Sequence, residues 1–258
     1  MIPIPQYPKG ADLLRDKVVV VTAAAGTGIG SAVARRSLEE GARVVLSDWH
    51  ERRLGEKAEE LTGLGEVHAI PCDVTKEEQI GALIEGARQR FGRIDVLINN
   101  AGLGGSRSIV DMTDEEWSRV LDVTLNGTFR ATRAAVRAFL AQGGGGAIVN
   151  NASVIGWRAQ AEQAHYAAAK AGVMALTRCA AVDVAPHGIR VNAVAPSLAM
   201  HPFLAKVTTE ELLEELTARE VSGRAAEPWE VANVMVFLAS DYASYLTGEV
   251  VSVSSQHA

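Results

Sequence analysis

The chain has 258 residues, a formal net charge of −6 and 48% hydrophobic residues. This length suits one large α/β domain or two small ones, with enough apolar side chains to build a core. The acidic balance and the lack of any Lys/Arg block argue against nucleic acid or an anionic membrane as the main partner.

The N-terminal sequence, the apolar runs and the cysteines together predict a cytoplasmic protein. The opening MIPIPQYPKGADLLRDK has no basic region followed by an apolar one, so we expect no signal peptide. No apolar run approaches the roughly 20 residues of a membrane helix. Cys72 and Cys179 are far apart and in no Cys-x-x-Cys pattern. We expect both to be small buried side chains, with no disulfide framework and no metal site.

From residue 17 onward, short apolar runs alternate with longer amphipathic stretches. KVVVVTA is a β-branched run, which indicates a strand buried on both faces of a parallel sheet. Further strands are predicted at ARVVLSD, VHAIPCD, RIDVLINNAG, AIVNNAS, IRVNAVA and EVVSVSS. Helical spacing predicts two helices before the last strand and others at 29–41, 51–62, 75–91, 113–141 and 164–184.

Seven strands with intervening helices predict one open, doubly wound parallel sheet of the Rossmann type. The sequence shows no internal repeat and no linker that would divide it. We therefore expect an N-terminal extension at 1–16 followed by a single α/β domain at 17–258.

The stretch TAAAGTGIG lies where the first strand meets the first helix. Gly26, Gly28 and Gly30 allow a tight turn and a close ligand, and a helix N-terminus offers unpaired N–H groups to a pyrophosphate. A plain strand-to-helix turn can have a similar sequence. The flanking strand and helix favour the dinucleotide interpretation.

Asp48 ends the next strand, eighteen residues beyond Gly30. An acid at that place accepts hydrogen bonds from the adenosine ribose and repels a 2′-phosphate, so NAD is expected rather than NADP. The alternative is that Asp48 merely caps a helix. Arg52 and Arg53 follow closely and moderate the expected preference for NAD.

AHYAAAKAG places Tyr166 and Lys170 four residues apart in an alanine-rich run. Ala favours a helix, and residues i and i+4 share one helix face, so a phenol and an ammonium should lie side by side. Alone, this spacing fits a helix surface better, with Tyr at a core edge and Lys in water. Other motifs must decide between a surface and a chemical pair.

Those motifs are present over nearly the whole chain after residue 16, and together they resemble the short-chain dehydrogenase/reductase family. They are the glycine turn, CDV with Asp73, NNAG at 99–102, Ser153, Tyr166 with Lys170, RVNAVAP at 190–196 and YLTGEVVSV. Their order and spacing agree, including the thirteen residues from Ser153 to Tyr166.

The resemblance implies an enzyme that moves a hydride between a nicotinamide and a secondary alcohol or ketone. Tyr166 would be the general acid/base, Lys170 would stabilise its phenolate and bind the nicotinamide ribose, and Ser153 would hold the substrate oxygen. A free phenol has a pKa of about 10. The neighbouring ammonium and the oxidised nicotinamide are expected to lower it.

The resemblance also implies a set of cofactor contacts. Asp73 and Val74 would lie against the adenine, and NNAG beside the cofactor, although NNAG could be only a strand-ending turn. The full expected set is Gly26, Thr27, Gly28, Ile29, Gly30, Asp48, Asp73, Val74, Asn100, Ala101, Gly102, Tyr166, Lys170 and Pro196.

Several positions depart from the family pattern. Thr124 stands where an asparagine usually completes a catalytic tetrad through a water, and Asn126 should face elsewhere. We expect Thr124 to bond a water and to alter the proton relay without abolishing activity. Ala23 and Ala24 open the glycine turn, APS replaces Ala-Pro-Gly, His201 replaces a frequent threonine, and VSVSSQHA lacks Asp-Gly-Gly.

The segment between Pro196 and Pro228 is where the family places a substrate lid. An apolar wall in SLAMHPFLAKV, together with Trp157, favours a bulky hydrophobic substrate. Arg158, Lys206 and His201 would rim the pocket, with Gln160 nearby, and bind an anionic handle such as that of an acyl-CoA. The alternative is that these charges are solvated lid surface. The chain is also similar to reductases of bacterial steroid-ring degradation, which act on alicyclic CoA thioesters.

Two other functions stay open. One is a 3-oxoacyl carrier-protein reductase, which usually prefers NADP and has a basic docking patch. The other is a catalytically weak nucleotide-binding regulator. The resemblance further implies a homotetramer, in which helices at 113–141 and 164–184 pair across one two-fold axis and the C-terminal strand meets its mate across another.

Overall fold

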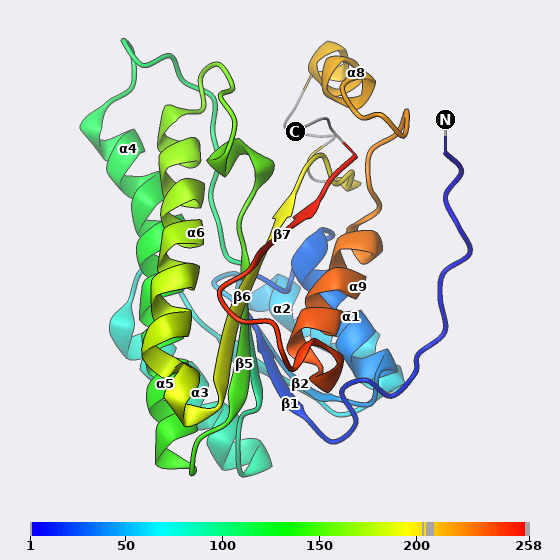
Figure 1. Ribbon diagram of the computed structural model, residues 1–258, viewed down its shortest axis with the longest axis vertical. Coiled ribbons are helices and arrows are strands. Elements are labelled where there is room, and N and C mark those ends of the chain that lie inside the picture. Colours follow the sequence, from blue (N-terminus) through cyan, green and yellow to red (C-terminus); the bar gives the residue numbers. More distant parts are fainter. Residues whose placement is uncertain (1, 203, 205–208, 256–258) are drawn as a thin grey trace.

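The computed structural model describes residues 2–202, 204 and 209–255. The described residues form a seven-stranded parallel sheet of order β3-β2-β1-β4-β5-β6-β7 (Figure 1). This architecture confirms the predicted fold class. The strands are β1 (Val18–Val21), β2 (Arg43–Asp48), β3 (Val67–Pro71), β4 (Val96–Asn99), β5 (Gly146–Asn151), β6 (Ile189–Pro196) and β7 (Val250–Val253).

Helices cover both faces of this sheet. α1, α2 and α9 lie on one face and α3, α4, α5 and α6 on the other, whereas α8 stands apart beyond the sheet's carboxyl edge (Figure 1). Their bounds are α1 (Ile29–Glu39), α2 (Glu51–Leu61), α3 (Glu77–Phe91), α4 (Asp114–Leu121), α5 (Gly127–Ala141), α6 (Ala164–Val184), α8 (Glu210–Ala218) and α9 (Pro228–Ala239).

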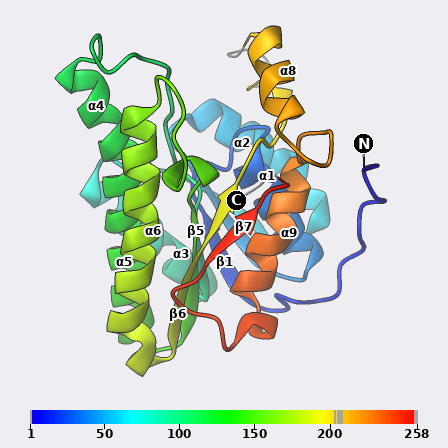
Figure 2. The same ribbon diagram turned by 45° about the horizontal axis from the view of Figure 1, so that its top comes forward.

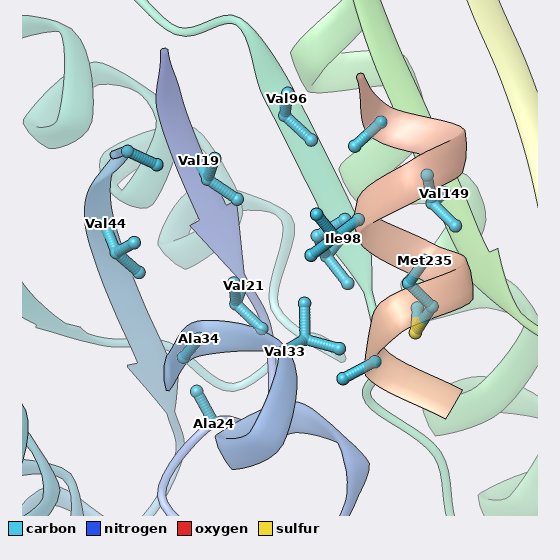
Figure 3. Close-up of a cluster of buried hydrophobic side chains, with 14 of the residues drawn as sticks. Val19, Val21, Ala24, Val33, Ala34, Val44, Val96, Ile98, Val149 and Met235 are labelled. Atoms are coloured by element: carbon cyan, nitrogen blue, oxygen red, sulfur yellow. The ribbon is translucent and has the colours of Figure 1, made fainter. Parts of the chain in front are cut away.

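The all-valine strand β1 shows why a buried parallel strand has no polar face. Val19 and Val21 belong to the core shared with Val33 of α1 and Met235 of α9 (Figure 3). Alternate residues point to opposite faces, so Val18 and Val20 lie in the second core, under α3 and α5. Both sets are fully buried.

The strand order reverses between β1 and β4, near the middle of the sheet. The chain runs outward from β1 to β3 on one side and from β4 to β7 on the other. Ligands of open α/β sheets bind outside the carboxyl ends of the strands where the order reverses. The turn after β1 and the segments after β4 and β5 all begin at this edge.

The predicted helix at 113–141 is not continuous. It consists of α4, a wide π-helical turn at Asp122–Asn126, and α5. The hydroxyl of Thr128, in the first turn of α5, donates to the carbonyl of Thr124 in the π-helical turn at 2.8 Å. A side-chain group that enters the helical hydrogen-bond ladder is a recognised cause of such irregularities. Helical periodicity in the sequence does not reveal it.

Residues 2–16 run as an extended arm alongside α1 and α9 (Figure 2). Tyr7 packs edge-on against Trp229 of α9, with ring centroids 5.3 Å apart. Glu40 accepts the N–H of Leu13 at 3.0 Å and pairs with the buried Arg36. The arm is therefore held by specific contacts with both helices.

The expectation that both cysteines are buried is wrong for one of them. Cys72 is buried, but Cys179 is exposed on α6. Val182, one turn later on the same helix face, is 76% exposed. The face of α6 away from the sheet is thus uncovered in the single chain.

Candidate active site

Ser153, Tyr166 and Lys170 meet at the carboxyl edge of the sheet. Ser153 follows β5, where its Oγ accepts the N–H of Ile155 at 3.3 Å. Tyr166 and Lys170 stand in the first two turns of α6, and the Lys170 Nζ lies 5.5 Å from the centroid of the Tyr166 ring. The expected helical pairing is therefore present in the structure.

Burial acts on both members of this pair. Lys170 is only 3% exposed, and desolvation lowers the pKa of its ammonium to about 8. Desolvation raises the pKa of Tyr166, and a hydrogen bond with Ser153 acts in the opposite direction. Desolvation is the larger of the two effects on Tyr166. The lowering of the phenol pKa beside a bound nicotinamide stays a prediction. At neutral pH the site therefore holds a neutral phenol beside a largely charged lysine.

Lys170 also reaches the end of β5. Its Nζ donates to the main-chain carbonyl of Asn151 at 2.5 Å. This hydrogen bond holds the lysine across the crevice between α6 and the sheet. A buried ammonium needs such an acceptor, because burial of a charge without a partner is costly.

Thr124 is fully buried, and its hydroxyl both accepts a hydrogen bond from Leu103 and donates one to it. Its Oγ1 accepts the N–H of Leu103 at 3.0 Å and donates to the Leu103 carbonyl at 3.2 Å. The hydroxyl proton is therefore engaged by the main chain of Leu103. Bonding of Thr124 to a water stays a prediction. Asn126 bonds Asp122 at the surface at 3.1 Å and faces elsewhere, as predicted.

The loop after Leu103 passes close to Tyr166. A Cβ on Gly104 would lie 3.8 Å from the Tyr166 ring, and one on Gly105 would lie 3.4 Å from His165 Nε2. His165 is buried, and its Nδ1 accepts the N–H of Tyr166 at 2.9 Å. His165 therefore packs beside the start of α6. This loop therefore lies against Tyr166 and His165.

The glycine turn crosses the carboxyl end of β1. The expected phosphate-binding residues Gly26, Thr27, Gly28, Ile29 and Gly30 lead into the first turn of α1, with Gly28 as its N-cap. A Cβ on Gly30 would clash with the Ala23 carbonyl and with Nδ2 of Asn100. Ala23 itself takes a left-handed conformation, with φ of 51°. A residue with a side chain thus fills a position that favours glycine.

Asp48 links this turn to the end of β2. Its two carboxylate oxygens accept the N–H of Ala25 at 3.2 Å and the N–H of His50 at 3.0 Å. His50, and not Asp48, occupies the N-cap position of α2. The carboxylate therefore lies beside the glycine turn, where its remaining lone pairs can accept hydroxyl donors.

The other expected cofactor residues border the same edge. Asp73 accepts the backbone N–H and the hydroxyl of Thr75 at 2.9 and 2.8 Å, which shapes the turn before α3. Val74 is buried next to it. Gly102 lies beside Lys170, since a Cβ on it would be 3.3 Å from Nζ. The N–H of Ala101 donates to the Thr22 hydroxyl at 3.1 Å, and Pro196 ends β6.

These residues fit a nicotinamide dinucleotide. The turn leads into the N-terminus of α1, where the helix offers N–H groups to a pyrophosphate. Asp48 and Lys170 stand at separate places along the edge, as two ribose contacts require. In addition, the buried Oδ1 of Asn151 has no hydrogen-bond donor among the described residues.

The residues expected to select the substrate are less closely grouped. Trp157 is 49% exposed at the end of the turn after Ser153. Gln160 lines a cavity of about 480 Å³ between residues 107–109 and 159–167. Ser153, Tyr166 and Lys170 are not among the residues that line this cavity. Lys206 lies outside the described residues.

His201 lies over the glycine turn. A Cβ on Gly28 would be 3.4 Å from the imidazole ring, and partial burial lowers the pKa of that ring. The imidazole therefore lies beside the expected pyrophosphate site. The sequence predicts His201 only at the rim of the substrate pocket.

Two polar residues near the site were missed in the sequence. Asn151 lies in the predicted strand AIVNNAS, so its periodicity gives no sign of a function. The available signal is the Asn-Asn pair at 150–151, which repeats the pair at 99–100. Glu220 is buried and accepts the hydroxyl of Ser255 at 2.8 Å and, at 3.4 Å, the N–H of Leu198. Its partners are far away in the sequence, so no local pattern identifies it.

Across the described residues, no group of three or more His, Cys, Asp or Glu side chains could hold a metal ion. In the same part of the chain, none of the helices has both the length and the apolar composition needed to cross a membrane.

Comparisons with known proteins agree with this geometry. A family model described as enoyl-(acyl carrier protein) reductase matches residues 23–255. The chain is 65% identical over 255 residues to (5R,7aS)-5-hydroxy-7a-methyl-1-oxo-2,3,5,6,7,7a-hexahydro-1H-indene-carboxyl-CoA reductase of Mycobacterium tuberculosis, across 98% of this chain and 97% of that one. It is 40% identical over 241 residues to a 3-oxoacyl-(acyl-carrier-protein) reductase of Thermotoga maritima, across 93% of this chain and 97% of that one.

A solved structure points the same way. A short chain dehydrogenase from Mycobacterium smegmatis is 59% identical and superposes with a TM-score of 0.89, covering 99% of each chain. The expected family resemblance is confirmed. The chain belongs to the short-chain dehydrogenase/reductase family, and it is an oxidoreductase that acts on alcohol and ketone groups.

Proposed function

We propose that this enzyme transfers a hydride between NAD(H) and a secondary alcohol or ketone on a bulky alicyclic acyl-CoA. The observation that carries the chemistry is the meeting of Ser153, Tyr166 and Lys170 beside the glycine turn. The relative whose name specifies an indene-carboxyl-CoA reductase supports the substrate class.

The chain's own residues supply the proton and hold the substrate, and a bound nicotinamide supplies or accepts the hydride. Because burial keeps Tyr166 protonated, its phenol can donate to the oxygen of a ketone in the reductive direction. The Ser153 hydroxyl holds that oxygen beside the phenol. The nearby Lys170 ammonium stabilises the phenolate that forms, and it would bind the nicotinamide ribose.

The proposed preference for NAD rests on Asp48, whose carboxylate lies beside the glycine turn and would repel a 2′-phosphate bound there. Arg52 pairs with Glu56 on the exposed face of α2. Arg53 has a buried Nε without an acceptor among the described residues. If NADP(H) proves to be the better cofactor, Arg53 is the first candidate for the phosphate clamp.

Substrate selection is assigned to the apolar Trp157 and to the cations Arg158 and Lys206, with Gln160 at the rim. Ser153 and Tyr166 contact only the reacting oxygen, so binding of a distant anionic handle must position the rest of the molecule. Such remote binding can be used to lower the reaction barrier, so removal of the handle should reduce kcat as well as affinity.

The test compares a CoA thioester of an alicyclic ketone acid with its free acid and a neutral ester. We expect the highest kcat/KM for the thioester, and a smaller preference with weaker salt dependence in Arg158→Ala and Lys206→Ala. Arg88→Ala on the surface of α3 is the matched control. Equal kcat/KM for all three substrates would leave a general hydrophobic-alcohol dehydrogenase.

A second candidate is reduction of a 3-oxoacyl group on a carrier protein, which the 40% identical relative supports. It predicts that a carrier-protein thioester with NADPH is turned over faster than the CoA thioester with NADH. The two activities are separated by one assay that varies both the carrier and the dinucleotide.

We further propose a cytoplasmic homotetramer built from the domain at 17–258, with residues 1–16 as its extension. Exposed apolar residues on the outer helices, Phe129 on α5 and Val182 on α6, support pairing of these helices across a two-fold axis. Light scattering at micromolar concentration should give four times the chain mass, and a monomer would contradict this.

A further inference from the structure

The sequence repeats Asn-Asn at the ends of two adjacent strands, and the structure pairs them. Asn99 of β4 is in register with Asn150 of β5. Because strand residues alternate between faces, Asn99 and Asn150 share one face and Asn100 and Asn151 the other. The two pairs therefore contact different parts of the protein.

The first pair belongs to the core on the side of α5 and α6. Asn99 Nδ2 donates to Asn150 Oδ1 at 2.9 Å, and Asn150 Nδ2 donates to the Thr177 hydroxyl of α6 at 2.9 Å. Both asparagines are buried. This network joins strands to helices and does not reach the glycine turn.

The second pair joins the glycine turn to Lys170. Asn151 Nδ2 donates to Asn100 Oδ1 at 2.9 Å, and Asn100 Nδ2 donates to the Ala23 carbonyl in the turn at 3.1 Å. At the other end, the main-chain carbonyl of Asn151 accepts Lys170 Nζ at 2.5 Å. One chain of contacts thus connects the expected pyrophosphate site with the expected nicotinamide-ribose contact.

We propose that Asn151 is a positioning residue, which acts through Asn100 to hold the glycine turn and Lys170 at a fixed separation along the bound dinucleotide. Without the Asn151 amide, the carbonyl of Asn100 loses its donor and the strand end under Lys170 loses its tie to the turn. This inference rests on the proposed nicotinamide chemistry.

The test measures the dissociation constant of NADH by energy transfer from tryptophan, without substrate. Asn151→Ala should weaken binding about fivefold, which corresponds to the loss of one hydrogen bond. Asn100→Ala should weaken it at least as much, and the double variant no more than Asn100→Ala alone. Independent, multiplying effects would overturn the proposal.

Three further arms separate positioning from folding. Asn151→Asp keeps the shape but lacks the donor, so it should behave like Asn151→Ala. Asn150→Ser, on the opposite face of the same strand, should lower the melting temperature and leave NADH binding within twofold of wild type. In steady state, Asn151→Ala should raise KM for NADH about fivefold and change kcat less than threefold.

A purely structural role of Asn151 would instead lower the active fraction, and therefore kcat, with KM unchanged, and that result would overturn the proposal. NADH binding by Asn151→Ala within twofold of wild type would do so as well. Failure of the wild type to bind either NADH or NADPH would refute the proposed function, which is a separate outcome.

Discussion

The helix that carries the reacting residues and the segment that would select the substrate differ in how they are held. α6 packs against β6 and buries Lys170 among eight buried residues along its length. α8, in the segment after β6, has no buried residue. The chemistry thus rests on a helix fixed by the core, and substrate choice on a surface helix held mainly at its ends.

This difference has a physical consequence for each region. In α6, the position of a side chain is set by close packing, so a changed functional group should affect chemistry and leave position intact. In the segment after β6, few buried contacts oppose movement, so small changes should affect affinity more than turnover. The following experiments test this division, from the largest expected effect to the smallest.

Tyr166→Phe should remove the proton carrier without disturbing the packing of the ring. We expect kcat to fall by about 10²–10⁴-fold, the usual contribution of general acid/base catalysis, while NADH binding stays within twofold. Tyr242→Phe, at an exposed tyrosine, is the matched control and should leave kcat unchanged. Retention of more than about a tenth of wild-type kcat, with chemistry rate-limiting, would remove Tyr166 from its assigned role.

Lys170→Met should stabilise the cofactor-free protein while impairing its activity. Burial lowers the pKa of Lys170 to about 8, so between about pH 8 and its unfolded value near 10.5 the unfolded chain binds more protons. Wild-type stability should therefore rise with pH across this window. At pH 7 the variant avoids the cost of burying a charge, and we expect a gain of about 1–3 kcal/mol in the free energy of unfolding.

Urea unfolding at pH 7 and pH 10 checks this prediction. The gain should shrink toward pH 10, because the folded wild type then holds a neutral amine. Lys76→Met, at an exposed lysine, should show little difference at either pH. A variant less stable than wild type at pH 7 would show that the hydrogen bond to Asn151 outweighs desolvation.

The same division explains what the sequence could and could not predict. The strands and the shared helix face of Tyr166 and Lys170 follow from local periodicity, since helical residues four apart share a face. The glycine turn follows from its three glycines between a strand and a helix. The hydrogen bond of Thr124 in the π-helical turn joins it to Leu103, twenty-one residues away. The exposure of Cys179 likewise depends on what covers α6, which local periodicity does not encode.

Asn151 and Glu220 also make contacts that local periodicity does not predict. Asn151 bonds Asn100 across 51 positions and Glu220 bonds Ser255 across 35. Hydrogen bonds between distant residues leave no periodic signal, so these two appear only when the chain is folded.

Asp48→Ala tests whether the carboxylate beside the glycine turn selects NAD(H) over NADP(H). Wild type should have a higher kcat/KM with NAD(H) than with NADP(H), and the variant should narrow that ratio at least about tenfold, because a like charge facing the 2′-phosphate is removed. Asp48→Asn keeps an acceptor for one backbone N–H and should narrow the ratio with less loss of overall affinity. A wild-type preference for NADP(H) would contradict the assignment.

Glu220→Gln should produce the smallest effect, in the segment after β6. Glu220 stands just beyond α8 and contacts Leu198, near the start of the segment, and Ser255, which follows β7. One buried carboxylate thus holds both ends of the segment to the C-terminal strand. The amide keeps the size of the side chain but replaces one acceptor oxygen with a donor, which weakens the hold without opening a cavity.

We expect about a threefold rise in KM for the ketone substrate, in line with the loss of part of one hydrogen bond, with kcat and NADH binding unchanged. Steady-state kinetics at saturating NADH measure all three quantities. Glu215→Gln on the exposed face of α8 is the matched control. If Glu220→Gln lowered kcat and left KM unchanged, the segment after β6 would control chemistry as well as binding, and the contrast between the two regions would fail.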